Sequence, residues 1–173
     1  SALPHVPLQI PGKDRAEYEK ALGEETPYDG SQGYFPNQNP RATYAAMITK
    51  LDQQIGEIKQ KLDELGLAEN TIIVITSDNG PTYTGGVDFD FFESSKPFAN
   101  GYGRTKGFVY EGGIRVPMIV NWPGKVQAGS SSDHISIFYD WLPTICELVG
   151  VPIPADTDGE SFLAAIYGNA QKP

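Results

Sequence analysis

Residues 71–76 read Thr-Ile-Ile-Val-Ile-Thr, and residues 77–81 that follow them read Ser-Asp-Asn-Gly-Pro. The apolar run shows no alternation with polar residues, which is typical of a β-strand covered on both faces, as in parallel sheets. The Gly-Pro pair then forces the chain to turn. Ligands of open α/β sheets bind beyond the carboxyl ends of the strands. Asp78 and Asn79 lie at that end, so the stretch predicts a fold class and the place of a site.

Asp78 and Asn79 both offer hard oxygen donors, which suit Ca²⁺ or Mg²⁺ better than zinc. Two adjacent donors reach one ion if the chain bends beside them. Asp-Asn-Gly is also an ordinary turn signal, and the spacing alone favours the turn. The residues themselves leave both interpretations open.

A long amphipathic helix is expected before this strand. Asn39-Pro40 is a typical helix start, with Asn as N-cap and Pro in the first helical position. Apolar residues then recur at helical spacing as far as Leu65, and Gly66 is expected to end the helix. We expect the apolar stripe to pack against the sheet. A helix that leads directly into a buried strand is the α/β pattern.

A second conspicuous stretch, residues 103–117, holds Lys106 in a glycine-flanked loop. A Lys there offers a point-charge contact to an anionic oxygen, although exposure to solvent is the usual fate of a Lys. Glu111 and Arg115 stand on either side of a Gly-Gly pair. This predicts a tight backbone turn with a Glu–Arg pair across it. An apolar run at 118–122 follows and is expected to be the second strand.

The two histidines occupy different settings. His5 lies among three prolines, in a segment that is expected to be extended. On the residues alone a surface-loop role is favoured for His5. His134 lies near a short extended run, and neither spacing nor context gives it a catalytic role.

The remaining segments are mostly supporting structure. Residues 82–102 form an aromatic-rich loop that is expected to border the site and to influence substrate choice. Asp140 is expected to cap a helix over 141–149, which Gly150 ends. Cys146 on that helix is expected to be a buried small apolar residue.

Composition excludes several classes of function. The chain has 173 residues, a net charge of −9 and one cysteine. The charge argues against nucleic acid or an anionic membrane as a partner, and one cysteine excludes an internal disulfide framework. With 39% hydrophobic and 20% charged residues, the composition is that of a globular protein.

Several of these strings together resemble a known family. The Ser77–Gly80 string, Lys106-Gly107 and the Tyr110–Pro117 string resemble the second half of the catalytic domain of type I sulfatases, the formylglycine-dependent arylsulfatases of the alkaline phosphatase superfamily. The resemblance covers nearly the whole chain. Its further matches are Pro4–Pro7, Trp122–Lys125, Asp140–Thr144 and Asp158–Phe162.

The resemblance implies a fold and a set of roles. The fold would be α/β, part of an alkaline-phosphatase-like sandwich with a mostly parallel sheet flanked by helices. Asp78 and Asn79 would be ligands of one divalent cation, usually Ca²⁺. Lys106 would contact the sulfate oxygens, and His5 the ester-oxygen side. The substrate would be a sulfated small molecule or glycan, and the enzyme periplasmic or secreted.

Parts of the family pattern have no match in this sequence. The nucleophile of the family lies in a Cys/Ser-x-Pro-x-Arg motif, which does not occur here; the one cysteine is Cys146. The early pair of Asp metal ligands has no match either. We therefore expect residues 1–173 to be a partial sulfatase domain that is inactive alone and that can associate through exposed sheet edges.

Two other functions remain to be weighed. One is a phosphatase or phosphodiesterase of the same superfamily, but neither histidine follows Asp78 as a zinc ligand pair would. The other is a non-catalytic α/β binding domain, complete as given, which predicts a stable monomer with a closed sheet edge.

Overall fold

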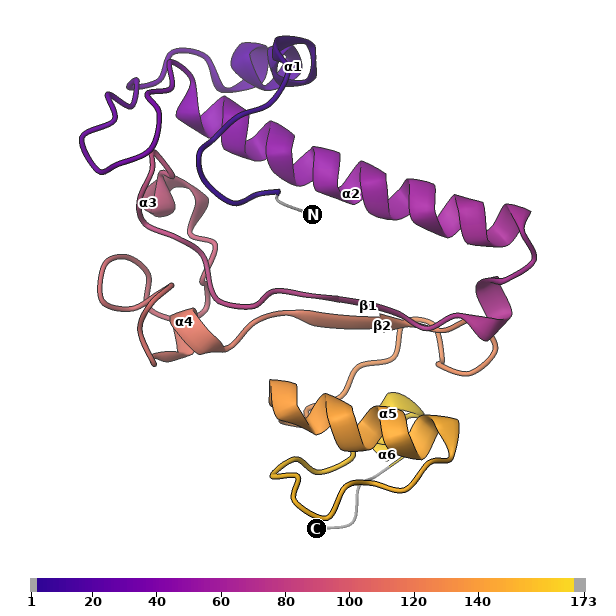
Figure 1. The fold of residues 1–173 in the computed structure, drawn as a ribbon. Coiled ribbons are helices and arrows are strands. Elements are labelled where there is room, and N and C mark those ends of the chain that lie inside the picture. The colour runs from indigo at the N-terminus through magenta and orange to yellow at the C-terminus, as the bar shows by residue number, and fades with distance from the viewer. Residues whose placement is uncertain (1–2, 170–173) are drawn as a thin grey trace. The chain divides into compact units, whose positions relative to one another are not determined.

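The structure, a computed structural model, describes residues 3–169, which form two compact units. Unit 1 comprises the described residues up to 61 together with 76–118, and unit 2 comprises 62–75 together with those from 119 onward. Figure 1 labels the helices and strands along the chain. They are α1 (Gly12–Leu22), α2 (Pro40–Glu64), η1 (Ala68–Asn70), β1 (Ile73–Thr76), α3 (Phe89–Phe92), α4 (Glu111–Ile114), β2 (Met118–Asn121), η2 (Phe138–Asp140), α5 (Trp141–Val149) and α6 (Leu163–Ile166).

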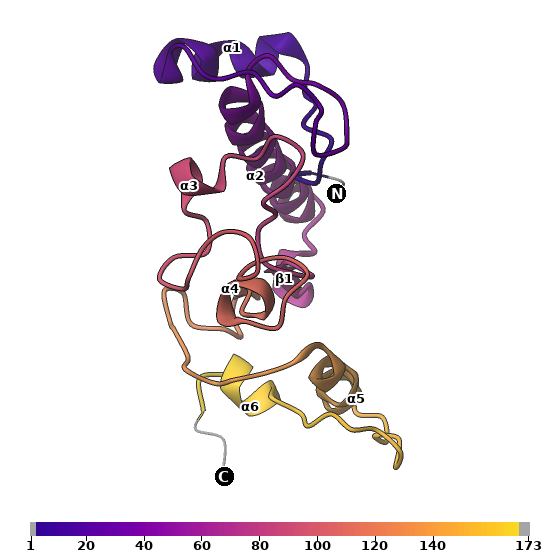
Figure 2. The same cartoon turned by 90° about the vertical axis from the view of Figure 1, so that its left-hand side faces the viewer.

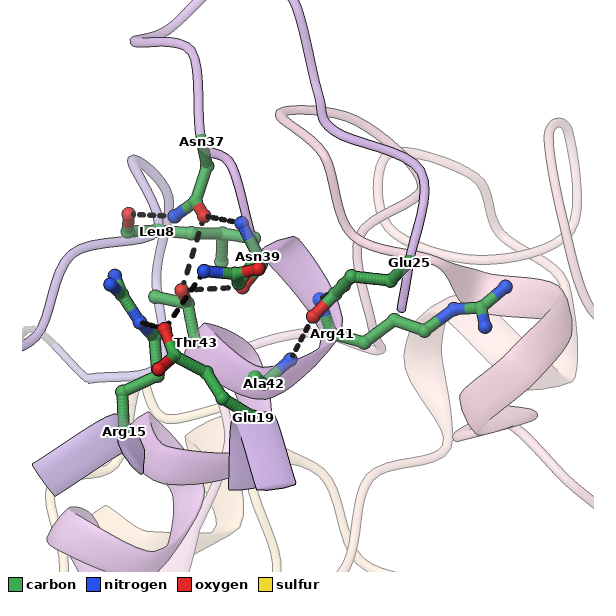
Figure 3. A network of polar contacts seen from close by, with 9 residues as sticks. All are labelled: Leu8, Arg15, Glu19, Glu25, Asn37, Asn39, Arg41, Ala42 and Thr43. Carbon is green, nitrogen blue, oxygen red and sulfur yellow. Dashed lines mark hydrogen bonds and ion pairs between the residues drawn. The ribbon is translucent and has the colours of Figure 1, made fainter. Parts of the chain in front are cut away.

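Helix α2 begins where the sequence predicts, but its N-terminus is capped by another residue. The side chain of Asn39 donates to Glu19 Oε1 over 2.8 Å. The free backbone N–H groups at the start of α2 are bound by the carboxylate of Glu25, which accepts from Arg41 and Ala42. Figure 3 shows the Glu25 side chain reaching Ala42 from outside the helix. Asn39 holds the predicted N-cap position, since its carbonyl accepts from Thr43 N–H, but its side chain makes no capping bond because the Glu25 carboxylate takes that place.

The core of unit 1 forms around the first turns of α2. Tyr44 and Met47 pack with Val6, Leu8 and Val87 in one buried cluster. Helix α1 has no buried residues and lies beside the N-terminal part of α2 in both views (Figures 1 and 2). The extended segment that carries His5 is thus held to the unit by the buried side chains of Val6 and Leu8.

The apolar stripe of α2 is covered along only part of its length. The buried residues of the helix all lie between Pro40 and Met47. Farther along, Ile48 and Ile58 are 42% and 58% exposed. The expectation that the whole stripe packs against the sheet is wrong for this chain, because the described residues cover only its beginning.

Strands β1 and β2 form a two-stranded sheet. Thr76 Oγ1 donates to Pro117 O over 2.9 Å, and Gly80 N–H donates to Gly113 O over 2.8 Å. The residue number rises from 76 to 80 on the segment of β1 while its partner falls from 117 to 113 on the segment of β2. The two strands therefore run antiparallel. The parallel arrangement expected for most of the sheet is not found among residues 3–169, because an unbroken apolar run reports burial and not strand direction.

Burial along β1 also differs from the prediction. Its residues alternate between half-buried and exposed, and Val74 is 36% exposed. The expected cover on both faces is therefore not provided by the described residues. The apolar run still forms a strand, as predicted, since its β-branched residues favour the extended backbone.

Unit 2 has a small core of its own, made by α5, α6 and the segment between them. Phe162 is 1% exposed, and its ring meets that of Trp141 edge-on at 4.8 Å. Cys146 is buried, as predicted. Gly150 ends α5 in the left-handed conformation. Asp140 does not cap α5; its carboxylate accepts from the N–H groups of Ile137 and Glu160. Within residues 3–169, no helix combines the length and apolarity that crossing a membrane requires.

Candidate functional site

The chain bends directly after β1, at the predicted metal ligands. Ser77 Oγ donates to Asn79 O over 2.8 Å, and Asn79 Nδ2 donates to Gly80 O over 3.0 Å. Asn79 takes part in the second bond through its amide nitrogen, so its side-chain oxygen is left as an acceptor. Asp78 is exposed and Asn79 half-buried. The bend thus presents a carboxylate and an amide oxygen from neighbouring positions, as the sequence predicts.

Gly80 holds this bend against the Gly-Gly pair of α4. Its N–H donates to Gly113 O over 2.8 Å. A Cβ at Gly80 would lie 1.9 Å from Gly112 O. Backbone meets backbone here, and only glycine allows the approach.

The same glycine pair supports the loop that carries Lys106. A Cβ at Gly113 would lie 2.1 Å from Phe108 O and 2.6 Å from Thr105 O. The Glu–Arg pair expected across the turn is confirmed, because Arg115 Nη1 lies 2.9 Å from Glu111 Oε2. The Tyr110–Pro117 string is thus a backbone support for the residues on either side of it.

Lys106 contacts both the bend and the N-terminal segment. Its backbone N–H donates to Pro81 O over 3.1 Å. Its Nζ lies 3.1 Å from His5 Nε2, across 101 residues of sequence. His5 Nδ1 lies 2.6 Å from Val6 O. A carbonyl only accepts and an ammonium only donates, so the imidazole carries its proton on Nδ1 and accepts at Nε2.

The four predicted site residues therefore come from three segments of unit 1 that touch one another. His5 and Lys106 meet directly. Lys106 binds the backbone of Pro81, which follows Asp78 and Asn79 on the same bend. A cation and an imidazole thus contact each other, and the cation lies on a loop whose backbone is bonded to the bend that carries the two oxygen donors. This arrangement suits an anionic substrate, with the charge of Lys106 half-buried and the ring of His5 exposed.

The oxygen donors at the bend are of the type that a hard divalent cation prefers, but two donors are too few to complete its coordination. Asp78 and Asn79 supply oxygen ligands, whereas Ca²⁺ takes six to eight. Among residues 3–169, no group of three or more His, Cys, Asp or Glu side chains is placed to hold a metal.

A polar site that sequence reasoning missed lies beside the start of α2. Arg41 Nη2 lies 2.7 Å from Asp88 Oδ2, and both residues line a cavity of about 190 Å³. Burial raises the pKa of the Asp88 carboxyl, but hydrogen bonds from Phe91 N–H and Arg41, with the charge of Arg41, outweigh this and hold it below its usual value. No local spacing links two residues that are 47 positions apart, so no sequence signal was available.

A model of a known protein family, described as Sulfatase, matches residues 3–151. The chain belongs to the sulfatase family. Human steryl-sulfatase is 34% identical over 145 residues, which cover 80% of this chain and 24% of that protein. An N-acetylglucosamine-6-O-sulfatase of Bacteroides thetaiotaomicron is 32% identical over 130 residues, covering 75% of this chain and 21% of that protein. The chain thus spans about a quarter of the length of these sulfatases.

Solved structures agree with this membership and with the α/β fold class, which they confirm. The crystal structure of Ps i-CgsB in complex with k-i-k-neocarrahexaose covers 96% of this chain, with a TM-score of 0.72 and 29% identity. This chain covers 32% of that protein. A phosphonate monoester hydrolase from Silicibacter pomeroyi matches 76% of this chain and 23% of its own, with a TM-score of 0.58 and 28% identity. The fold is therefore shared by sulfatases and by an enzyme named for another ester.

Proposed function

We propose that the protein to which these residues belong hydrolyses sulfate esters, and that residues 1–173 are a partial sulfatase catalytic domain. The observation that carries this proposal is the 3.1 Å contact between Lys106 Nζ and His5 Nε2, beside the bend with Asp78 and Asn79. Membership of the sulfatase family supports it. Sulfated sugars are the proposed substrate class, because a related structure holds a carrageenan oligosaccharide and a relative is named for a sulfated sugar.

In this proposal Lys106 binds the sulfate group. Its ammonium has three N–H donors, so one hydrogen bond to His5 leaves others for sulfate oxygens. The positive charge of Lys106 also stabilises the negative charge that develops on the ester oxygen as the sulfur–oxygen bond breaks.

His5 orients Lys106 and assists the leaving group. The hydrogen bond from Nδ1 to Val6 O fixes the ring, so Nε2 faces the ammonium. The departing alcohol oxygen needs one proton, and the ammonium of Lys106, held by His5 Nε2, is the group placed to supply it. The sulfuryl group ends as sulfate after water is added.

Asp78 and Asn79 would hold a divalent cation, proposed to be Ca²⁺, together with ligands outside this chain. When bound, the cation supplies positive charge to the sulfate oxygens and to the nucleophile. The nucleophile, proposed to be a formylglycine, has no matching motif in this sequence, so the attacking step involves residues other than these.

The decisive experiment measures hydrolysis of an aryl sulfate by the longer protein that contains this chain. We expect turnover that falls on chelation and returns with Ca²⁺. Lys106→Ala should lower kcat/KM by about 10²–10³, the usual cost of losing one electrostatic contact in the transition state. Lys125→Ala removes an exposed Lys elsewhere and should leave the rate unchanged. Equal rates for the two variants would contradict the proposal.

A phosphatase or phosphodiesterase is the second candidate function. The similarity to a phosphonate monoester hydrolase supports it. Zinc chemistry of that kind requires histidine ligands, and this sequence has two histidines. The ring of His134 stacks on Phe162 within unit 2. Comparing aryl sulfate, phosphate and phosphonate monoesters separates the two candidates: faster cleavage of either phosphorus ester would favour the second.

A further inference from the structure

Three aromatic rings on the chain segments around Pro81 and Lys106 form a cluster that the proposed reaction does not use. We name Tyr83, Tyr102 and Phe108 the Tyr102 cluster. The ring of Tyr102 meets Tyr83 at 5.0 Å and 88°, and Phe108 at 5.5 Å and 74°. Tyr83 and Phe108 lie 6.3 Å apart. The two flanking rings therefore hold Tyr102 edge-on from two sides.

The Tyr102 cluster is built on the hydrogen bond that places Lys106. Lys106 N–H donates to Pro81 O over 3.1 Å. Tyr83 follows Pro81 by two positions, and Phe108 follows Lys106 by two. The aromatic rings and the ammonium thus share one backbone support within unit 1.

Tyr102 is exposed although it is positioned by its neighbours. Its side chain is 75% exposed, whereas Tyr83 and Phe108 are half-buried. Among residues 3–169, the phenol hydroxyls of Tyr83 and Tyr102 have no hydrogen-bond partner. The Tyr102 ring therefore offers an apolar face to a ligand, on the same loop as the ammonium of Lys106.

We propose that the Tyr102 cluster is a saccharide subsite, in which the ring of Tyr102 stacks on a pyranose ring of the substrate while Lys106 binds its sulfate. A pyranose has an apolar C–H face and a polar rim of hydroxyls. The cluster has the matching parts: an aromatic surface and two phenol hydroxyls. This inference rests on the proposed function, because it assigns the substrate class of the same site.

Binding to the 173-residue chain tests the subsite without any need for catalysis. The probes are sulfated hexasaccharides of carrageenan and of chondroitin, with 4-nitrophenyl sulfate as the sugar-free probe, and dissociation constants come from NMR titration. We expect Tyr102→Ala to weaken hexasaccharide binding roughly fivefold to tenfold, as the loss of one aromatic contact predicts. Tyr102→Phe keeps the ring and should remain within about twofold of the original protein.

Phe35→Ala is the matched control, since Phe35 is also a strongly exposed aromatic of unit 1, at 67%, and lies outside the cluster. It should leave hexasaccharide binding unchanged. The subsite is overturned if no hexasaccharide binds, if Tyr102→Ala binds as tightly as the original protein, or if Tyr102→Ala weakens 4-nitrophenyl sulfate to the same degree.

The two proposals fail separately. Aryl sulfate hydrolysis by the longer protein, with hexasaccharide binding unaffected by Tyr102→Ala, would leave the sulfatase proposal standing and remove the subsite. Hexasaccharide binding that depends on Tyr102, without cleavage of any sulfate ester, would support the subsite and contradict the sulfatase proposal.

Discussion

Gly113 shows how one residue without a side chain positions several that have one. The carbonyls of Phe108 and Thr105 occupy the space that a Cβ would need. The carbonyl of Gly113 itself accepts from Gly80. Since backbone cannot rotate away as a side chain can, any larger residue at 113 must displace the Lys106 loop, the bend at Asp78 or both.

Gly113→Ala is therefore expected to destabilise unit 1 by about 1–3 kcal/mol, the range for overpacking a filled site, and to weaken anion binding at Lys106. Thermal unfolding followed by circular dichroism measures the first effect. Gly56→Ala is the matched control, because a Cβ there meets nothing within 4 Å. As a helix-interior change it should stabilise the protein by about 1 kcal/mol. Equal melting temperatures for the two variants would contradict this account.

At the scale of elements, α2 owes its start to a residue outside it. The Glu25 carboxylate satisfies two N–H groups of the first turn and places a negative charge at the positive end of the helix dipole. Figure 3 shows the neighbouring contacts of Asn37, Thr43 and Glu19 around the same helix end. The loop before α2 is thus ordered by the helix that it caps.

Glu25→Ala should cost about 0.5–2 kcal/mol of stability, as the loss of a helix cap does, and should loosen the loop at 25–38. Hydrogen exchange at the amides of Arg41 and Ala42 measures the cap directly. Glu24→Ala removes an exposed neighbouring acid and should change neither protection nor stability. Unchanged exchange in Glu25→Ala would show that the cap is dispensable.

At the scale of the whole molecule, the chain carries the proposed binding groups without a complete catalytic set. Two oxygen donors, proposed as metal ligands, lie at the bend, the nucleophile motif has no match, and apolar side chains such as Ile58 and Ile119 are more than half exposed. The chain spans 24% of the length of human steryl-sulfatase. Its chemistry is therefore expected to depend on residues that it does not supply.

The 173-residue chain alone is expected to bind Ca²⁺ no more tightly than about millimolar, the weak end of the range for protein sites, and to hydrolyse no aryl sulfate. Calorimetric titration with CaCl₂ measures the affinity. Asp78→Asn should abolish what binding there is, while Asp133→Asn, an exposed acid in unit 2, should not. Micromolar binding or detectable turnover would overturn this expectation.

Local patterns predicted the elements well, and contacts distant in sequence poorly. The bounds of α2 followed from Pro40, the apolar spacing and Gly66, since these act within one helix. The Glu25 cap and the Arg41–Asp88 pair were missed, because loop residues have no period that reports their partners. Strand direction was missed because an apolar run is the same in both directions. That Lys106 and His5 belong to one site was predicted only through the family resemblance; their direct contact was not predicted, and the roles of both remain predictions.

The close packing at Gly80, Gly112 and Gly113 also bears on how such a protein can diversify. Peptide groups are the one part of the chain that mutation leaves chemically constant. Since they set the spacing between the bend and the Lys106 loop, exposed side chains of the segment at 82–102, such as Phe91 and Tyr102, can vary without moving the charged groups. A lineage that keeps these three glycines can therefore change the exposed side chains of one loop while the proposed anion-binding geometry is inherited intact.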